Sequence, residues 1–186
     1  VTELVIEEGS EAKLCDGAFQ YADVSEKLYV SSKITDVGSD VFDSFNIEKN
    51  GACYVGHILC RVYSDDEELK IKEGTTVIAD NAFEYSKIKK LTIPASLKYI
   101  GEDALSDTAQ LRKITVDKNN KYFVVENDTL FDKAKTRLIK YASESKRTEY
   151  KVPGSVKTID EYAFYSGSSL KKIDIGSNVE YIDITM

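Results

Sequence analysis

The sequence predicts an α/β fold, a right-handed and β-rich solenoid of short stacked coils, from a pattern that recurs along the chain. The dipeptide Ala-Phe stands at residues 18–19, 82–83 and 163–164, with Val41-Phe42 and Ala104-Leu105 as variants. An aliphatic residue stands five positions before the aromatic, or its leucine substitute, in each copy: Leu14, Val37, Ile78, Ile100 and Ile159. Each unit has too little apolar surface to form a core alone and buries it only by stacking on the next copy.

The spacing of the copies narrows this prediction to a leucine-rich-repeat solenoid. Ile71 and Ile93 are 22 residues apart, Ile93 and Val116 are 23 apart, and Val152 and Ile175 are 23 apart. This period lies inside the range of about 20–29 residues that is typical of leucine-rich repeats. We therefore expect residues 1–186 to form a single solenoid domain.

Each part of the repeat predicts a local structure. The alternation in residues 91–93 and 114–116 predicts strands with one side chain turned in and the next turned out. The V-x-x-I segment that follows has a period of three, which suits an extended, turning chain. The Ala-Phe segment is flanked by Asp, Glu and Ser, which indicates one short helical turn that places the aromatic ring in an interior ladder.

Two segments interrupt the period. Val30 and Ile71 are 41 residues apart, and Val116 and Val152 are 36 apart. We expect insertions at about residues 46–68 and 118–148. Apolar runs on both sides of the polar residues 132–135 predict a β-hairpin in the second, and the first resembles it. Insertions of this kind often project from one face and carry recognition, although covering an edge of the core is the alternative.

Composition and charge exclude several classes of function. Hydrophobic residues make up 42% of the chain and charged residues 31%, which is typical of a folded domain. The net charge of −7 argues against nucleic acid or anionic lipid as a partner. The apolar runs are too short to span a bilayer, so no membrane insertion is expected. The absence of an initiator Met and a last repeat whose Phe would fall at position 187 suggest a piece of a longer protein.

The residues that could carry chemistry favour structural roles. His57 is the only histidine and lies between Cys53 and Cys60, but zinc would need further ligands and a nucleophile would need an orienting group. The odd number of cysteines does not describe a disulfide scaffold. The acidic run 65–68 is expected to be a solvated loop, and residues 117–122 lack the glycine of a calcium loop. We predict no catalytic, cofactor-binding or metal site.

The outward side chains of the strands are the predicted interaction surface. One row contains Tyr29, Lys70, Thr92, Thr115, Lys151 and Asp174, and a second contains Asp36, Tyr99, Thr158 and Tyr181. Tyrosine is favoured in binding surfaces because it offers a large amphipathic area at low entropic cost. The alternative is that these are ordinary solvent-facing strand residues, since Thr and Tyr are good strand formers.

The repeat resembles one known family. The residues that carry the match are Ile93, Pro94, Ser96, Leu97, Ile100, Gly101, Ala104 and Leu105, and in a later copy Val152, Pro153, Ser155, Val156, Ile159, Ala163 and Phe164. These units are similar to the BspA-like (treponemal-type) leucine-rich repeat family. The resemblance implies a curved α/β solenoid in a surface or secreted protein of host-associated bacteria. The cysteine that often stands three residues after the Phe in that family is absent from this chain.

The function that the resemblance implies is a non-catalytic, extracellular module for protein binding or adhesion, with a host or bacterial surface protein as partner and no cofactor. A passive spacer or cap that presents another domain is the alternative. A hydrolase is the least favoured reading.

Overall fold

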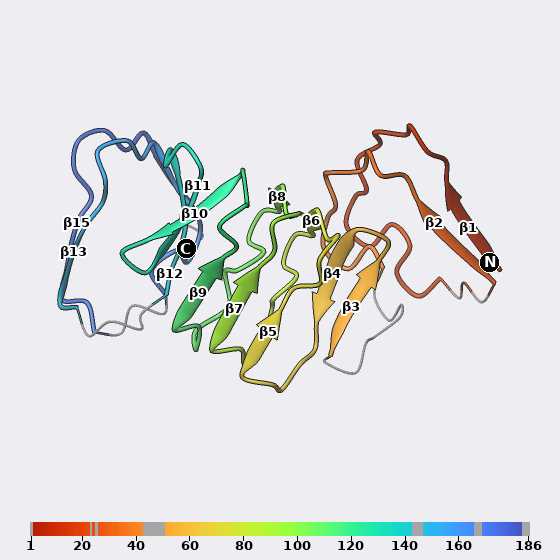
Figure 1. Ribbon diagram of the computed structural model, residues 1–186, viewed down its shortest axis with the longest axis horizontal. Coiled ribbons are helices and arrows are strands. Elements are labelled where there is room, and N and C mark those ends of the chain that lie inside the picture. The colour runs from red at the N-terminus through yellow and green to blue at the C-terminus, as the bar shows by residue number, and fades with distance from the viewer. Residues whose placement is uncertain are drawn as a thin grey trace.

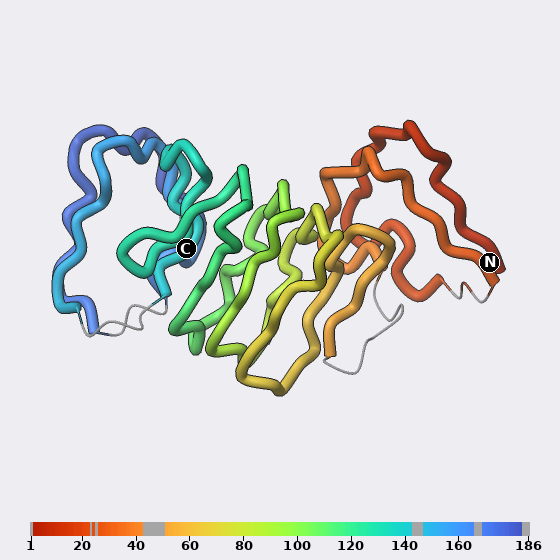
Figure 2. The backbone as a smooth tube through the Cα atoms, viewed as in Figure 1, coloured from red at the N-terminus to blue at the C-terminus, as the bar shows by residue number. Residues whose placement is uncertain are grey.

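The coils of the chain stack along its long axis, from the N-terminal coils at one end to the C-terminal coils at the other (Figure 2). The computed structural model describes residues 2–22, 24, 26–42, 51–142, 147–165 and 169–183. Within these ranges the chain forms short strands and turns and contains no helix.

The first strand of each regular coil belongs to a front ladder of parallel strands (Figure 1). Its three sheets are β1 (Glu3–Ile6) with β2 (Lys27–Val30), β5 (Glu68–Lys70) with β7 (Lys90–Ile93) and β9 (Lys113–Val116), and β13 (Glu149–Lys151) with β15 (Lys172–Asp174). Leu69, Leu91 and Ile114 align in register and are buried, while the residues beside them face outward. The predicted strand alternation is therefore confirmed at this ladder.

The V-x-x-I segments form a second, back ladder. Its strands are β4 (Ile58–Val62), β6 (Val77–Ile78) and β8 (Tyr99–Ile100), then β12 (Arg137–Tyr141), β14 (Thr158–Ile159) and β16 (Tyr181–Ile182). Leu59, Ile78 and Ile100 are in register, and so are Leu138 and Ile159. We call this register position the aliphatic slot. A single parallel bridge between Leu14 and Val37 holds it in the N-terminal coils.

The two segments that break the repeat contain antiparallel strands. β3 (Ala52–Val55) pairs with β4, and β10 (Phe123–Glu126) pairs with β11 (Thr129–Asp132), which pairs with β12. β4 and β12 also pair in parallel with β6 and β14, so they are rungs of the solenoid itself. β4 and β12 therefore do not project from the solenoid, which for these two strands agrees with the alternative that the segments cover the core. Residues 46–50 and 143–146 of the predicted insertions lie outside the described residues.

The Ala-Phe segments are tight turns, and the α/β label is wrong for the described residues. Two positions before the aromatic or its substitute, the backbone is left-handed in five coils: Gly17, Asp40, Asn81, Asp103 and Tyr162 have φ between 48° and 61°. Such a residue interrupts the run of negative φ that a helix needs, and Gly, Asn and Asp are the residues that tolerate it. The fold is therefore a β-solenoid.

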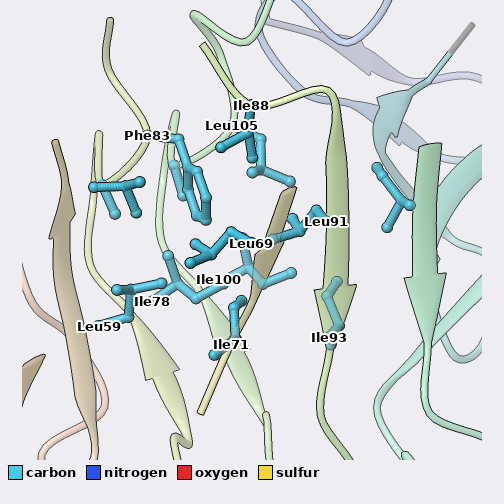
Figure 3. Close-up of a cluster of buried hydrophobic side chains, with 14 of the residues drawn as sticks. Leu59, Leu69, Ile71, Ile78, Phe83, Ile88, Leu91, Ile93, Ile100 and Leu105 are labelled. Carbon is cyan, nitrogen blue, oxygen red and sulfur yellow. The ribbon is translucent and has the colours of Figure 1, made fainter. Parts of the chain in front are cut away.

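The aromatic positions of consecutive coils are linked in the interior. The amide of Phe83 donates to the carbonyl of Ala104 in the next coil, and the amides of Val62 and Tyr141 make the equivalent bonds to Ala82 and Ala163. We call this position the aromatic slot. Val62 and Tyr141 thus occupy it in the two interrupted coils. Aliphatic side chains from both ladders pack around Phe83 in the central part of the core (Figure 3).

Candidate interaction surface

The outward row of the front ladder is divided into three pieces. Lys70, Thr92 and Thr115 lie side by side in register on β5, β7 and β9. Lys151 and Asp174 face outward as a pair on β13 and β15, and Tyr29 lies on β2 opposite Val5. These three sheets do not pair with one another, because β3 lies beside β2 and β10 lies beside β9.

The largest piece of this row is flanked by exposed ion pairs. Lys89 binds Glu67 and Lys90 binds Glu68, in each case between one coil and the next. The hydrogen bond and the charge of Lys90 lower the pKa of Glu68. Exposed pairs of this kind contribute little to stability. They make the face strongly polar, so that any binding here would depend on hydrogen bonds and charge complementarity.

The second predicted row is divided into two hollows, because the back ladder is itself two sheets. Asp36 and Tyr99 line one hollow of about 190 Å³. Thr158 and Tyr181 are in register and line another of about 350 Å³. In the latter, Nε of Arg137 donates to Asp160 over 2.8 Å, and burial nevertheless raises the pKa of the Asp160 carboxyl.

Sequence reasoning missed two cations that occupy equivalent positions in the interrupted coils. Arg61 follows Leu59 of the aliphatic slot by two residues, and Lys140 follows Leu138 by two. In both coils the aromatic slot comes three residues after the aliphatic slot, and five residues after it elsewhere. Aligning the interrupted coils on this shortened spacing would have revealed both cations.

Arg61 bridges the turns of the two coils that flank it. Nη1 of its guanidinium donates to Asp40 over 2.5 Å and Nη2 donates to Glu84 over 2.7 Å. Its side chain is only 13% exposed, and the two carboxylates are each 33% exposed. The space between these two turns, which we call the first gap, is therefore filled, and both of its carboxylates form ion pairs with a cation of the chain itself.

Lys140 lies fully buried at the corresponding second gap. Its Nζ donates to the carbonyl oxygens of Ser106 (3.0 Å) and Tyr162 (2.9 Å) and lies 6.0 Å from the centre of the Tyr165 ring. Burial lowers the pKa of this amine to about 8. Its bonds to main-chain carbonyls leave the side-chain carboxylates of the second gap without an ion pair to it.

A cavity of about 320 Å³ opens over the second gap. We call it the turn notch and define it by Tyr85, Asp103, Asp107, Glu161, Tyr162 and Tyr165. The rings of Tyr162 and Tyr165 meet edge to face with centres 5.6 Å apart. Partial burial and the neighbouring carboxylate of Glu161 raise the pKa of Asp103 to about 6.

His57 and two of the three cysteines lie in packed surroundings. Nε2 of His57 lies 3.0 Å from the carbonyl oxygen of Ile34, and Cys53 and Cys60 are buried and form no disulfide, whereas Cys15 is exposed. Burial holds the pKa of Cys60 well above its usual range, so that its reactive thiolate form is disfavoured. In the part of the chain that the structure describes, no group of three or more His, Cys, Asp or Glu side chains is arranged to hold a metal ion.

Parallel ladders, a 22–23-residue period and an interior aromatic column define a leucine-rich-repeat type of solenoid. The family model described as "BspA type Leucine rich repeat region (6 copies)" matches residues 63–141 and 140–186. The chain therefore belongs to the BspA-type leucine-rich repeat family, as the resemblance predicted.

Solved structures share this fold. A leucine-rich repeat protein from Eubacterium ventriosum is 29% identical, with a TM-score of 0.62 over 97% of this chain and 43% of its own. The pneumococcal vaccine antigen PcpA is 22% identical, with a TM-score of 0.57 over 97% of this chain and 46% of its own. The chain thus spans less than half the length of these two proteins.

A comparison with curated protein sequences gave no match. Among the described residues, no helix has the length and apolar character needed to cross a membrane.

Proposed function

We propose that the chain is a non-catalytic protein-binding module of a bacterial protein displayed outside the cell. The observation that carries this proposal is the family match, because it assigns most of the chain to a repeat whose fold typically serves as an interaction scaffold. The extracellular location rests on the resemblance, since members of this family are typically surface or secreted proteins. We also propose that residues 1–186 act as one solenoid unit.

The geometry supports recognition rather than chemistry. Register-paired coils hold Lys70, Thr92 and Thr115 at fixed spacing on one face. Because strand pairing already fixes the backbone of this surface, its backbone loses little conformational entropy on binding. The tyrosines of the back ladder and of the turn notch add amphipathic contacts to neighbouring hollows.

The experiment is a binding screen of the purified chain against individually purified surface proteins of bacteria and their hosts. For any partner that binds saturably, the variant with Lys70, Thr92 and Thr115 changed to Ala should bind at least tenfold more weakly if the front face is the site. A control variant with the exposed residues Asn119, Lys121 and Ser177 changed to Ala should bind like the wild type.

Two other outcomes would redirect the proposal. No saturable partner in the screen would favour the alternative, a passive spacer or cap. Hydrolytic activity that is lost on His57→Ala in a folded protein would support an enzyme.

A further inference from the structure

The two gaps arise from the same backbone change. In a regular coil the turn before the aromatic slot contains four residues, whereas β4 and β12 reach this slot with two. The shortened coils therefore leave the turns of their neighbours facing one another. At the first gap these turns even bond directly, since Asp80 N–H donates to the Val37 carbonyl and the Asn81 amide to the Ser39 hydroxyl.

The first gap shows what these turns bind. Asp40 stands three residues after the aliphatic slot of the preceding coil, and the chain's own Arg61 occupies the space in front of it. Glu84, from the following coil, forms the second ion pair with the guanidinium. An arginine between two carboxylates is a strong arrangement, because its planar fork matches carboxylate geometry.

The second gap has the same acceptor position without the guanidinium. Asp103 is the equivalent of Asp40, and Tyr165 is the equivalent of Glu84. Lys140 is the equivalent of Arg61, but its ammonium is held by two main-chain carbonyls beneath the turns. Among the described residues, no ion pair joins Asp103, Asp107 or Glu161 to a lysine or arginine.

The electrostatics of the turn notch are therefore only partly compensated. Asp103 and Glu161 belong to turns that are 58 residues apart in sequence, and the charge of Glu161 disfavours the ionised form of Asp103. Asp107 accepts the amide of Tyr85 over 3.2 Å and adds a third carboxylate. Lys140 supplies one positive charge from below, which is fewer than the negative charges around the opening.

The walls of the turn notch suit a flat cation. Tyr85, Tyr162 and Tyr165 line the cavity, and these residues are 76%, 48% and 55% exposed. Aromatic faces attract a guanidinium by cation–π interaction, worth about 0.5–2 kcal/mol depending on desolvation. A volume of about 320 Å³ is large enough for one long side chain, but small for a folded element.

We propose that the turn notch binds an arginine side chain presented by a protein partner, in the way that Arg61 occupies the first gap from within the chain. This inference rests on the proposed function of the chain as a protein-binding module and specifies the chemistry of one contact. The partner's arginine lies between Asp103 and Glu161 and stacks against the tyrosine rings. A basic segment of the partner thereby meets an acidic hollow between the turns.

The test uses NMR titration of the full chain with a blocked pentapeptide that has one arginine flanked by glycines. At about 0.15 M salt, where exposed charges are screened beyond roughly 8 Å, we expect saturable shifts at the amides of Tyr85, Tyr162 and Tyr165. A single side chain of this kind should bind with a Kd on the order of 1 mM. The peptide with citrulline, which has the shape of arginine without its charge, should bind at least tenfold more weakly.

Matched variants separate the notch from the overall charge of the chain. Asp103→Asn combined with Glu161→Gln should weaken the arginine peptide at least tenfold. Asp66→Asn combined with Glu73→Gln removes the same charge from exposed positions elsewhere and should change the Kd less than twofold. Circular dichroism and thermal melting establish that both variants are folded.

Three results would overturn the inference. They are chemical shift changes centred outside the turn notch, unchanged affinity of the Asp103/Glu161 variant, and equal binding of the arginine peptide and of a peptide with lysine in place of the arginine. Equal binding of free arginine, whose own carboxylate should be repelled, would instead identify a small-molecule site and also overturn it. The proposed function is tested separately. A partner from the binding screen that binds the wild type and the Asp103/Glu161 variant equally well would contradict the arginine site and leave the proposed protein-binding module intact.

Discussion

The two interrupted coils follow one backbone plan and differ in what lies at the gap that each one leaves. In both, an antiparallel strand leads into a strand of the back ladder, and a cation stands two residues after the aliphatic slot. Arg61 donates hydrogen bonds to two side-chain carboxylates, whereas Lys140 donates to two main-chain carbonyls. One gap is thereby sealed, and the other keeps an acidic cavity.

This difference shows how a repeat protein can vary its surface without changing its core. The aromatic slot is filled by Val62 in one interrupted coil and by Tyr141 in the other, and both are buried. The backbone pairing with the following coil is also equivalent, since the amides of Val62 and Tyr141 donate to the carbonyls of Ala82 and Ala163. The variation is confined to residues that face the gap, where substitution costs the fold little and changes what the surface can bind.

The largest expected effect tests whether the core truly runs through both interrupted coils. Tyr141→Ala should lower the free energy of unfolding by about 4 kcal/mol, because it empties a fully buried aromatic position that contacts Tyr150 and Phe164. Val62→Ala removes less volume and should cost about 2 kcal/mol. Urea denaturation followed by circular dichroism measures the free energy of unfolding of both variants. Equal losses of stability would contradict the view that Tyr141 fills its aromatic slot with more buried volume than Val62.

The next prediction compares the cations directly. Arg61→Met should lower the free energy of unfolding by about 2 kcal/mol, because it leaves Asp40 and Glu84 facing each other without a cation in a partly buried site. Lys140→Met should change it by less than about 1 kcal/mol, since the lost hydrogen bonds are offset by no longer burying a charge. Thermal melts of the two variants in one buffer provide the comparison, and a larger loss for Lys140→Met would reverse our account of the gaps.

The comparison also shows what could be predicted from sequence. The strands, the aliphatic slots and the aromatic column follow from residue spacing alone, because parallel coils of constant length must align equivalent positions. The tight turn replaced the predicted helical turn because residues such as Asn81 and Asp103 adopt positive φ, a choice that spacing does not show. All residues of the outward rows except Asp36 lie on strands, but the continuity of the rows depends on the positions of β3 and β10, which are a property of the whole stack.

The acidic notch was beyond sequence reasoning for a similar reason. Asp103 and Glu161 belong to coils that are not consecutive, and they meet only because the coil between them lacks part of its turn. Tyr162 is a local sequence signal for an unusual turn at this place. It is the one bulky residue two positions before the aromatic slot, where the backbone is left-handed and other coils have Gly, Asp or Asn.

A pH titration sharpens the difference between the two cations. The pKa of Lys140 is lowered to about 8 by burial, while the unfolded chain keeps the ordinary value of 10.5. The unfolded state therefore binds more protons between these values, so stability rises with pH across this window. From about pH 7.5 to 9 the wild type should gain about 1 kcal/mol relative to Lys140→Met. Denaturation midpoints measured in parallel test this, and parallel curves for the two proteins would contradict it.

The smallest effect belongs to the turn notch itself. The pKa of Asp103 is raised to about 6 in the folded chain from its ordinary value of 3.8, so the folded state binds more protons between these values. Stability due to this group is present below about pH 4 and is lost as the pH rises through 6. Asp103→Asn should therefore stabilise the chain at pH 7 and leave it less affected at pH 4. Because the carboxyl is partly solvated, we expect the gain to be below about 1 kcal/mol.

The matched change at the first gap gives the opposite sign and completes the comparison. Asp40→Asn removes a carboxylate that Arg61 binds, so it should destabilise the chain at pH 7, where Asp103→Asn stabilises it. Thermal melts of both variants at pH 4 and pH 7 measure the two signs together. If Asp103→Asn also destabilises at pH 7, the carboxylates of the turn notch have a compensating cation, and the two gaps are chemically alike. If the signs differ, the fold tolerates unneutralised charge at the second gap, as a site held open for an external cation requires.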